Sequence, residues 1–134
     1  MSDWIRIQKA FSFSEELGPL QLAWIGDSVW ELHQRLRHCQ SPGRMKALHR
    51  AVVAEVNASA QAEAFTRLAP YLSIEEKDLC RRGRNCAGRG PRTGDASAYG
   101  AATGFETMIG WLFLRNPARL AQLLDQLEDN ASDP

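Results

Sequence analysis

The sequence of 134 residues has no long apolar run, no paired cysteine motif and no excess of charge. No stretch approaches the roughly 18 consecutive apolar residues of a membrane span, so we expect none. The first residues, MSDWIRIQKAFSFSEE, mix charges throughout and do not predict a secretory signal. Cys39, Cys80 and Cys86 are odd in number and lack the C-x2-C spacing of zinc sites. We therefore expect reduced thiols and a cytoplasmic location.

Sixteen basic residues balance sixteen acidic residues, which at first argues against a nucleic-acid partner. A total, however, says nothing about how the charges are distributed. Residues 35–50 and residues 81–92 contain no Asp or Glu, and together they hold ten of the sixteen Lys and Arg residues. The balancing acids lie elsewhere, with a cluster near the C-terminal end. A neutral chain can therefore present a basic face.

Apolar residues recur at helical spacing nearly everywhere, and no segment alternates with a period of two. The sequence therefore predicts one all-α domain over residues 1–134, a bundle of five to seven helices. We expect its core at about residues 17–127, with an N-terminal segment and an acidic tail that partly fray. Three expected helices run from Pro19 to about Arg37, from about Arg44 to Leu68 (continuous or kinked), and from Ser73 to near Arg82. Two more are expected to begin at Asp95 and at Asn116-Pro117.

Residues 83–94, GRNCAGRGPRTG, contain four glycines and one proline, which predicts irregular structure. Arginine binds phosphate oxygens in a bidentate fashion, and glycine lets backbone N–H groups approach an anion closely. This segment is thus a candidate clamp for a nucleic-acid backbone. A flexible surface loop whose arginines only keep it soluble explains the composition equally well.

Two acids of the first long helix, Asp27 and Glu31, are four residues apart and lie on one face. That face is flanked by tryptophans, and it lies opposite an apolar stripe that includes Ile25, Val29 and Leu32. Gly26 costs about 1 kcal/mol relative to alanine in a helix, so we expect another segment to pack closely against it.

Glu106 lies on the edge of a strongly apolar helix. A carboxylate buried there without a partner costs several kcal/mol. Two explanations remain open from spacing alone. Glu106 either forms a salt bridge with an arginine, or shares a hard divalent cation with Asp27, since Mg²⁺ prefers a few carboxylates together with waters and phosphate oxygens.

Two segments carry short motifs, residues 22–29 (LAWIGDSV) and residues 104–110 (GFETMIG). They resemble the ribonuclease III family, in which the first is similar to the signature stretch that carries the catalytic aspartate and the second to the Phe-Glu-Ala-Leu-Ile-Gly motif. The pattern resembles the Mini-III branch in particular. The residues that carry this likeness are Gly26, Asp27, Trp30 and Glu31, then Arg82-Gly83-Arg84-Asn85, then Asp95, Tyr99 and Glu106.

The resemblance implies a homodimer of all-α endonuclease domains that hydrolyse double-stranded RNA with Mg²⁺, for which Mn²⁺ can substitute. It implies that Asp27 and Glu106 are catalytic and bind the metal, with Glu31 as a further candidate ligand. Asp95, Tyr99 and Thr103 are candidate supporting residues. The candidate RNA-binding residues come from the two basic segments and are Arg82, Arg84, Asn85, Arg89, Arg92, Lys46 and Arg50.

Ala23 and Thr103 stand where full-length relatives carry carboxylates, a change that the Mini-III branch shares. Those relatives also add a double-stranded-RNA-binding domain, whereas few residues follow the Glu106 helix here, so we expect weak RNA binding with a steep salt dependence. The branch is associated with maturing the ends of the large-subunit (23S) ribosomal RNA precursor, and a ribosomal protein is a further candidate partner. The alternative is a catalytically inactive RNA-binding or helical dimerisation module.

Two further expectations concern individual side chains. Trp24, Trp30 and Trp111 exceed what a small monomer needs, so we expect some of them at a dimer contact. His33 has no metal-ligand spacing to the other histidines, and we expect it to contact phosphate or solvent rather than act as a general base.

Overall fold

The computed structural model describes residues 1–12 and 16–132, and every regular element in them is helical. The predicted all-α class is therefore confirmed, and seven α-helices lie within the described residues. No helix among them is long and apolar enough to cross a membrane. The elements are α1 (Asp3–Arg6), α2 (Pro19–His38), α3 (Met45–Val56), α4 (Ala58–Leu68), the 3-10 helix η1 (Ala69–Tyr71), α5 (Ile74–Cys86), α6 (Ala96–Arg115) and α7 (Pro117–Ser132).

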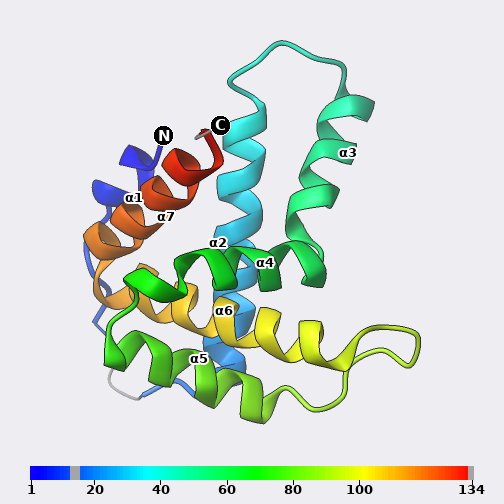
Figure 1. Cartoon of the computed structure of the whole chain (residues 1–134). Helices are drawn as coiled ribbons and strands as arrows, with labels where there is room; N and C mark the ends of the chain where they lie inside the picture. Colours follow the sequence, from blue (N-terminus) through cyan, green and yellow to red (C-terminus); the bar gives the residue numbers. More distant parts are fainter. Residues whose placement is uncertain (13–15, 133–134) are drawn as a thin grey trace.

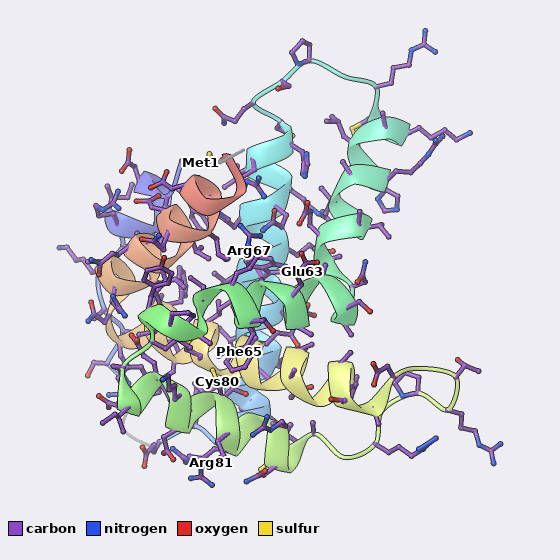
Figure 2. All side chains as sticks on the ribbon, in the orientation of Figure 1. Met1, Glu63, Phe65, Arg67, Cys80 and Arg81 are labelled. Atoms are coloured by element: carbon purple, nitrogen blue, oxygen red, sulfur yellow. The ribbon has the colours of Figure 1, made fainter. Side chains whose placement is uncertain are left out.

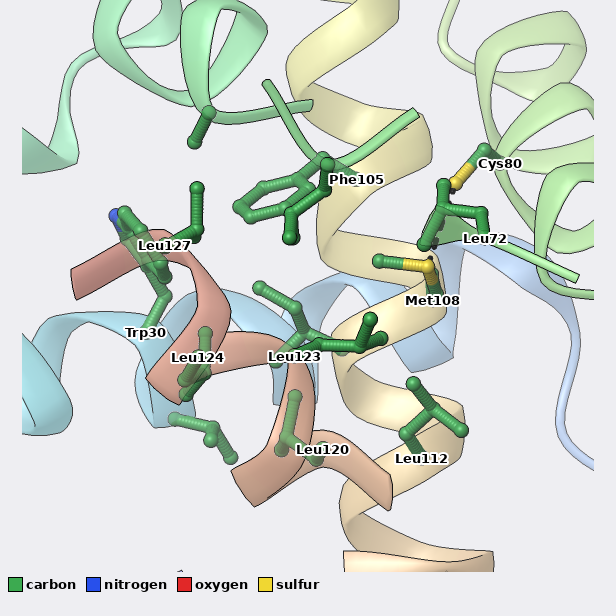
Figure 3. Packing of buried hydrophobic residues seen from close by; sticks show 14 of the residues in the cluster. Trp30, Leu72, Cys80, Phe105, Met108, Leu112, Leu120, Leu123, Leu124 and Leu127 are labelled. Atoms are coloured by element: carbon green, nitrogen blue, oxygen red, sulfur yellow. Dashed lines mark hydrogen bonds between the residues drawn. The ribbon is translucent and has the colours of Figure 1, made fainter. Parts of the chain in front are cut away.

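Helix α6 lies at the centre of the bundle, with α2, α4 and α5 packed around it (Figure 1). Its apolar residues form the middle of the core, and Phe105, Met108 and Ile109 are completely buried. Helix α7 closes the core with a row of buried leucines, as Figure 3 shows. Burying a side chain of this size contributes about 1.5–3 kcal/mol, so α6 and its neighbours dominate the stability of the fold.

Two segments extend from the same side of the bundle (Figure 1). One is α3 with the turn before it, and the other is the connection between α5 and α6, residues 87–95. Long side chains that end in nitrogen extend from both (Figure 2). The two acid-free stretches of the sequence thus flank one side of the molecule.

The helix starts follow their local signals. Pro19 is the first residue of α2, and Pro117 is the first residue of α7. The Ser73 hydroxyl accepts a hydrogen bond from the Glu76 N–H. In return, the Glu76 carboxylate accepts a hydrogen bond from the Ser73 N–H. The Asp95 carboxylate accepts hydrogen bonds from two N–H groups in the first turn of α6. All of these predicted starts are confirmed.

The predicted end of α5 near Arg82 is wrong, because the helix continues to Cys86. Gly83 lies inside the helix and packs so closely on α6 that a Cβ atom would meet the Thr107 side chain at 2.2 Å. This contact with α6 outweighs the low helix propensity of glycine. The irregular part of the glycine-rich segment is therefore residues 87–95.

The stretch that was expected to be either continuous or kinked breaks at Asn57. This residue has an extended backbone, with φ −72° and ψ 163°, and stands between α3 and α4. Its side-chain oxygen accepts a hydrogen bond from the Ala60 N–H at 2.9 Å, which caps α4. The break lets α3 extend away from the bundle while α4 packs on α6.

The face of α2 that enters the core differs from the predicted stripe. Leu32 is 46% exposed, whereas the polar side chains of His33 and Gln34 are almost fully buried. His33 receives a hydrogen bond from the Trp4 indole N–H at Nδ1 (3.1 Å), and its Nε2 lies 2.9 Å from the Glu128 carboxylate. The expectation that His33 contacts phosphate or solvent is thus wrong, because residues of α1 and α7 satisfy both ring nitrogens.

The same packing extends the core beyond the expected residues 17–127. Ile5 of α1 is completely buried in the main apolar cluster. The Phe11 N–H donates to the Leu114 carbonyl at 2.8 Å, and Arg6 pairs with Asp125 of α7 at 2.6 Å. These contacts join the N-terminal segment to the end of α6 and to the middle of α7.

Candidate active site

Two glycines bring α2 and α6 into backbone contact. A Cβ atom on Gly26 would lie 1.9 Å from the Glu106 carbonyl oxygen, and one on Gly110 would lie 1.9 Å from the Leu22 carbonyl oxygen. The helices can approach this closely only because neither position has a side chain. The predicted close packing at Gly26 is confirmed, and it places the residue after Gly26 beside the Glu106 turn.

This crossing brings the carboxyl group of Asp27 close enough to that of Glu106 to influence its titration. The Asp27 side chain is exposed, and that of Glu106 is mostly buried. Burial raises the pKa of Glu106 to about 8, with further increases from the hydrogen bond to Asp27 and from repulsion by its negative charge. Two carboxyl groups held this close favour either a shared proton or a bound cation.

The groups around Glu106 distinguish a salt bridge from a shared cation. Within the described residues, no Lys, Arg or His forms an ion pair with Glu106. Its neighbours are Asp27 and the amide of Gln61, which donates to Glu106 Oε2 at 3.4 Å. The salt-bridge explanation is therefore not supported. The oxygen ligands fit a hard divalent cation such as Mg²⁺, which binds one or two carboxylates and keeps several waters.

Gln61 is the site residue that sequence reasoning missed. It is only 2% exposed, and it reaches Glu106 from α4. A signal did exist in the sequence, because Gln61 falls on the same helical stripe as Ala64 and Leu68, three and seven residues later. A polar residue in an apolar stripe needs a buried partner, and here that partner is the candidate metal ligand.

Replacing Gln61 with alanine is expected to weaken Mg²⁺ binding about 10-fold or more, because residues that orient a metal ligand typically contribute that much. Calorimetric titration of the protein with Mg²⁺ measures the effect directly, without RNA. Gln40→Ala is the matched control, since Gln40 is exposed two residues beyond the end of α2 and its side chain donates to the Leu36 carbonyl. Equal Mg²⁺ affinities in the two variants would exclude Gln61 as a positioning residue.

The other predicted site residues have different surroundings. The described Asp, Glu, His and Cys residues include no cluster of three that could hold a metal ion. Glu31 lies 3.5 Å from Arg35, one turn further along α2, and its role as a ligand stays a prediction. Asp95 caps α6, and the Thr103 hydroxyl donates to the Tyr99 carbonyl at 3.0 Å. Ala23 and Thr103 are both buried, and neither side chain carries a carboxylate.

Tyr99 has a structural task at the candidate RNA-binding segment. Gly90, with φ +81°, lies against its ring, so that a Cβ atom would be only 2.5 Å away. This contact fixes the middle of residues 87–95 to the first turn of α6, where glycine permits the left-handed conformation. The seven candidate RNA-binding side chains are all exposed and come from α3, from the end of α5 and from residues 87–95.

The segment that contains Asp27 and Glu106 is similar in sequence to known proteins. The sequence profile of the Ribonuclease III domain matches residues 20–117, a range that includes both carboxylates and Gln61. The chain belongs to the ribonuclease III family. The resemblance inferred from the motifs is thereby confirmed.

Individual family members match over most of their length. The chain is 45% identical to the Mini-ribonuclease 3 of Synechococcus sp. over 85% of this chain and 83% of that protein. It is 50% identical to the Mini-ribonuclease 3 of Gloeobacter violaceus over 77% of this chain and 76% of that protein. The crystal structure of a Fusobacterium nucleatum protein superposes with a TM-score of 0.76, at 26% identity, over 87% of this chain and 89% of that one.

Proposed function

We propose that this ribonuclease III family member is a Mg²⁺-dependent endoribonuclease that matures the ends of the large-subunit ribosomal RNA precursor in the cytoplasm. Its class, an endoribonuclease of the ribonuclease III type, follows from its family. The observation that carries the proposal is the Asp27–Glu106 pair, which has no balancing cation among the described residues. The relatives named Mini-ribonuclease 3 support the choice of branch.

Different residues of the chain would bind the metal, position its ligand and bind the RNA. Bound Mg²⁺ supplies an activated water and neutralises charge on the phosphate. Asp27 and Glu106 offer the oxygen ligands for it, and Glu106 must first release its proton. Gln61 holds the Glu106 carboxylate in place through its amide N–H. The basic side chains of α3 and residues 87–95 grip the phosphates of a duplex, whose A-form shape is recognised without reading its sequence.

Incubation with a fully paired RNA, with and without Mg²⁺, followed by sizing of the products, tests this function. We expect discrete shorter duplexes with Mg²⁺ or Mn²⁺, none with a chelator, and no cleavage of the single strand alone. If the protein cleaves an RNA duplex of arbitrary sequence but not the paired ends of the ribosomal RNA precursor, it is an endoribonuclease but the proposed substrate is wrong. Binding without any cleavage would instead favour the inactive RNA-binding module.

Replacing Arg84 with alanine is expected to weaken RNA binding and to lower the slope of log affinity against log salt by about 1, because one phosphate contact is lost. Arg84 is exposed near the end of α5. Fluorescence anisotropy with a labelled duplex at several salt concentrations measures both quantities. The control is Arg115→Ala, because Arg115 is the last residue of α6 and lies outside the two basic segments. An unchanged slope in Arg84→Ala would remove Arg84 from the RNA interface.

Dimerisation is expected to use the exposed side of α2. Trp24 is 79% exposed and lines an apolar groove of about 360 Å³ with residues of α1, α2 and α6. Trp30, by contrast, is buried against Phe105 and donates to the Glu55 carbonyl, so it cannot serve at a contact. An exposed apolar patch of this kind is typical of an interaction surface.

Replacing Trp24 with glutamate is therefore expected to convert a dimer into a monomer at micromolar concentration. Sedimentation equilibrium measures the mass. Ile74→Glu is the matched control, because Ile74 is 90% exposed at the start of α5, outside the groove. A monomeric wild-type protein, or a dimeric Trp24→Glu variant, would contradict the assignment.

A further inference from the structure

A second hollow lies between α4, α5 and α6, and none of Asp27, Gln61 and Glu106 lines it. Its volume is about 280 Å³. Phe65 of α4 and Cys80 and Arg81 of α5 are among the residues that line it, and Figure 2 labels all three. The volume is close to the lower limit of small-molecule sites, about 300 Å³, so the hollow is suited to a small ligand.

One wall of this pocket is basic. Lys77, Arg81 and Arg84 stand four and three residues apart on α5, and therefore share one face of the helix. Arg81 pairs with Asp78, its Nε lying 3.2 Å from the carboxylate. No hydrogen bond or ion pair within the described residues engages the side chains of Lys77 and Arg84. Two cationic groups at the pocket are thus available to an anion.

The rest of the lining is apolar and aromatic. It includes the Phe65 ring of α4 and the small Ala101 side chain of α6. Cys80 adds an uncharged surface, because burial raises the pKa of its thiol to about 12. An aromatic ring next to cationic side chains suits a ligand that has both a flat ring system and a phosphate, since bases stack on aromatic side chains while arginine and lysine bind phosphate.

We propose that this pocket binds a nucleotide, with its base against Phe65 and its phosphate between Lys77 and Arg84. The nucleotide is either free in solution or an unpaired nucleotide of a bound RNA. Arg84 connects the two possibilities, because it lines the pocket and also belongs to the segment expected to bind the RNA backbone. The site goes beyond the proposed cleavage reaction and does not require it.

Titration with adenosine 5′-monophosphate, followed by amide chemical shifts and calorimetry, tests the pocket without RNA or Mg²⁺. We expect shifts centred on the pocket, with adenosine and inorganic phosphate each binding at least 10-fold more weakly than the complete nucleotide. Lys77→Glu should weaken nucleotide binding about 10-fold or more by reversing a charge on an exposed residue. Ala101→Leu, which fills the pocket without altering charge, should weaken it as well.

Lys9→Glu is the matched control, since Lys9 is exposed and lies outside the pocket. It should bind the nucleotide as the wild type does. Equal nucleotide binding by the wild type, Lys77→Glu and Ala101→Leu would overturn the proposal. Because this measurement uses no RNA, its result is independent of whether the protein cleaves ribosomal precursors.

Measuring RNA affinity in the presence of a chelator distinguishes a free nucleotide from an unpaired nucleotide of a bound RNA. A duplex with one unpaired adenosine is compared with the fully paired duplex, for the wild type and for Lys77→Glu. A preference for the bulged duplex that Lys77→Glu loses assigns the pocket to an RNA nucleotide. Nucleotide binding without such a preference assigns it to a free nucleotide. The absence of both in the wild type would refute the site.

Discussion

Replacing Asp27 with asparagine is expected to reduce RNA cleavage by about three orders of magnitude or more, which corresponds to about 4 kcal/mol in activation free energy. The substitution keeps the size of the side chain but removes one of the two charges that face a cation. Because Asp27 is exposed and its helix is held by Gly26 and Gly110, the fold should remain intact. Single-turnover cleavage of a paired RNA, with circular dichroism as the check on folding, measures both effects.

Mg²⁺ binding gives a second readout for the same variant. A cation present at 100 times its dissociation constant stabilises the folded protein by about 2.7 kcal/mol. For a chain of this size we expect the melting temperature of the wild type to rise by roughly 5–10 °C. The Asp27→Asn variant should show little or no rise. Full cleavage activity in this variant, or an undiminished shift, would contradict the role given to Asp27.

In the metal-free protein, the burial of Glu106 and its repulsion by Asp27 should together make stability depend on pH. The pKa of Glu106 rises from 4.5 to about 8 on folding, so between these values the folded chain keeps a proton that the unfolded chain releases. Stability from this group is therefore complete below about pH 4.5 and falls as the pH rises towards 8. Asp27→Asn should reduce that fall, while substitution of the exposed Asp129 of α7 by asparagine should not. Urea unfolding at pH 5 and pH 8 with a chelator makes the comparison.

Replacing Gly26 with alanine is expected to have the largest effect on stability. Its new methyl group would lie 1.9 Å from the Glu106 carbonyl oxygen and 2.9 Å from the Gly110 nitrogen, both of which are backbone atoms that cannot turn aside. Helices α2 and α6 must then separate. Overpacking typically costs about 1–3 kcal/mol and occasionally more, and this contact belongs to the upper end because no flexible side chain can yield. The gain of about 1 kcal/mol in helix propensity does not offset it.

Thermal and urea unfolding of Gly26→Ala should therefore show a loss of about 2–4 kcal/mol, together with weaker Mg²⁺ binding as the two carboxylates move apart. Gly43→Ala is the matched control, because the nearest atoms to its new methyl group would be 3.5 Å away on the flexible Leu48 side chain. That variant should be close to the wild type. Equal stability of the two variants would show that α2 and α6 do not depend on the close approach at Gly26.

Local chemistry explains which parts of the fold could be predicted. Helix starts at Pro19, Ser73, Asp95 and Pro117 depend on groups within one turn of the chain, and such groups are visible in the sequence. The end of α5 was not predictable in this way. Gly83 continues the helix only because α6 lies directly against it, and no neighbouring residue in the chain carries that information.

The faces of α2 illustrate the same limit. An apolar stripe in a sequence shows that a helix is amphipathic, but not which other helices cover it. Leu32 lies exposed beside the groove at Trp24, whereas His33 is buried because Trp4 and Glu128 supply partners for both ring nitrogens. Partners that come from distant parts of the chain decide the burial of a polar residue.

The sequence by itself determined the all-α class, the family, and the pair of acids at Asp27 and Glu106 as the candidate site. These follow from helical periodicity, capping residues and short motifs, all of which are local in the chain. Only the tertiary structure decided that the Asp27 carboxylate lies beside a largely buried Glu106, that Gln61 bonds to Glu106, and that Lys77 and Arg84 flank an aromatic pocket. Each of these depends on two helices meeting at a particular register. Backbone contacts such as Gly26 against Glu106 fix that register, and they form only when the chain is folded.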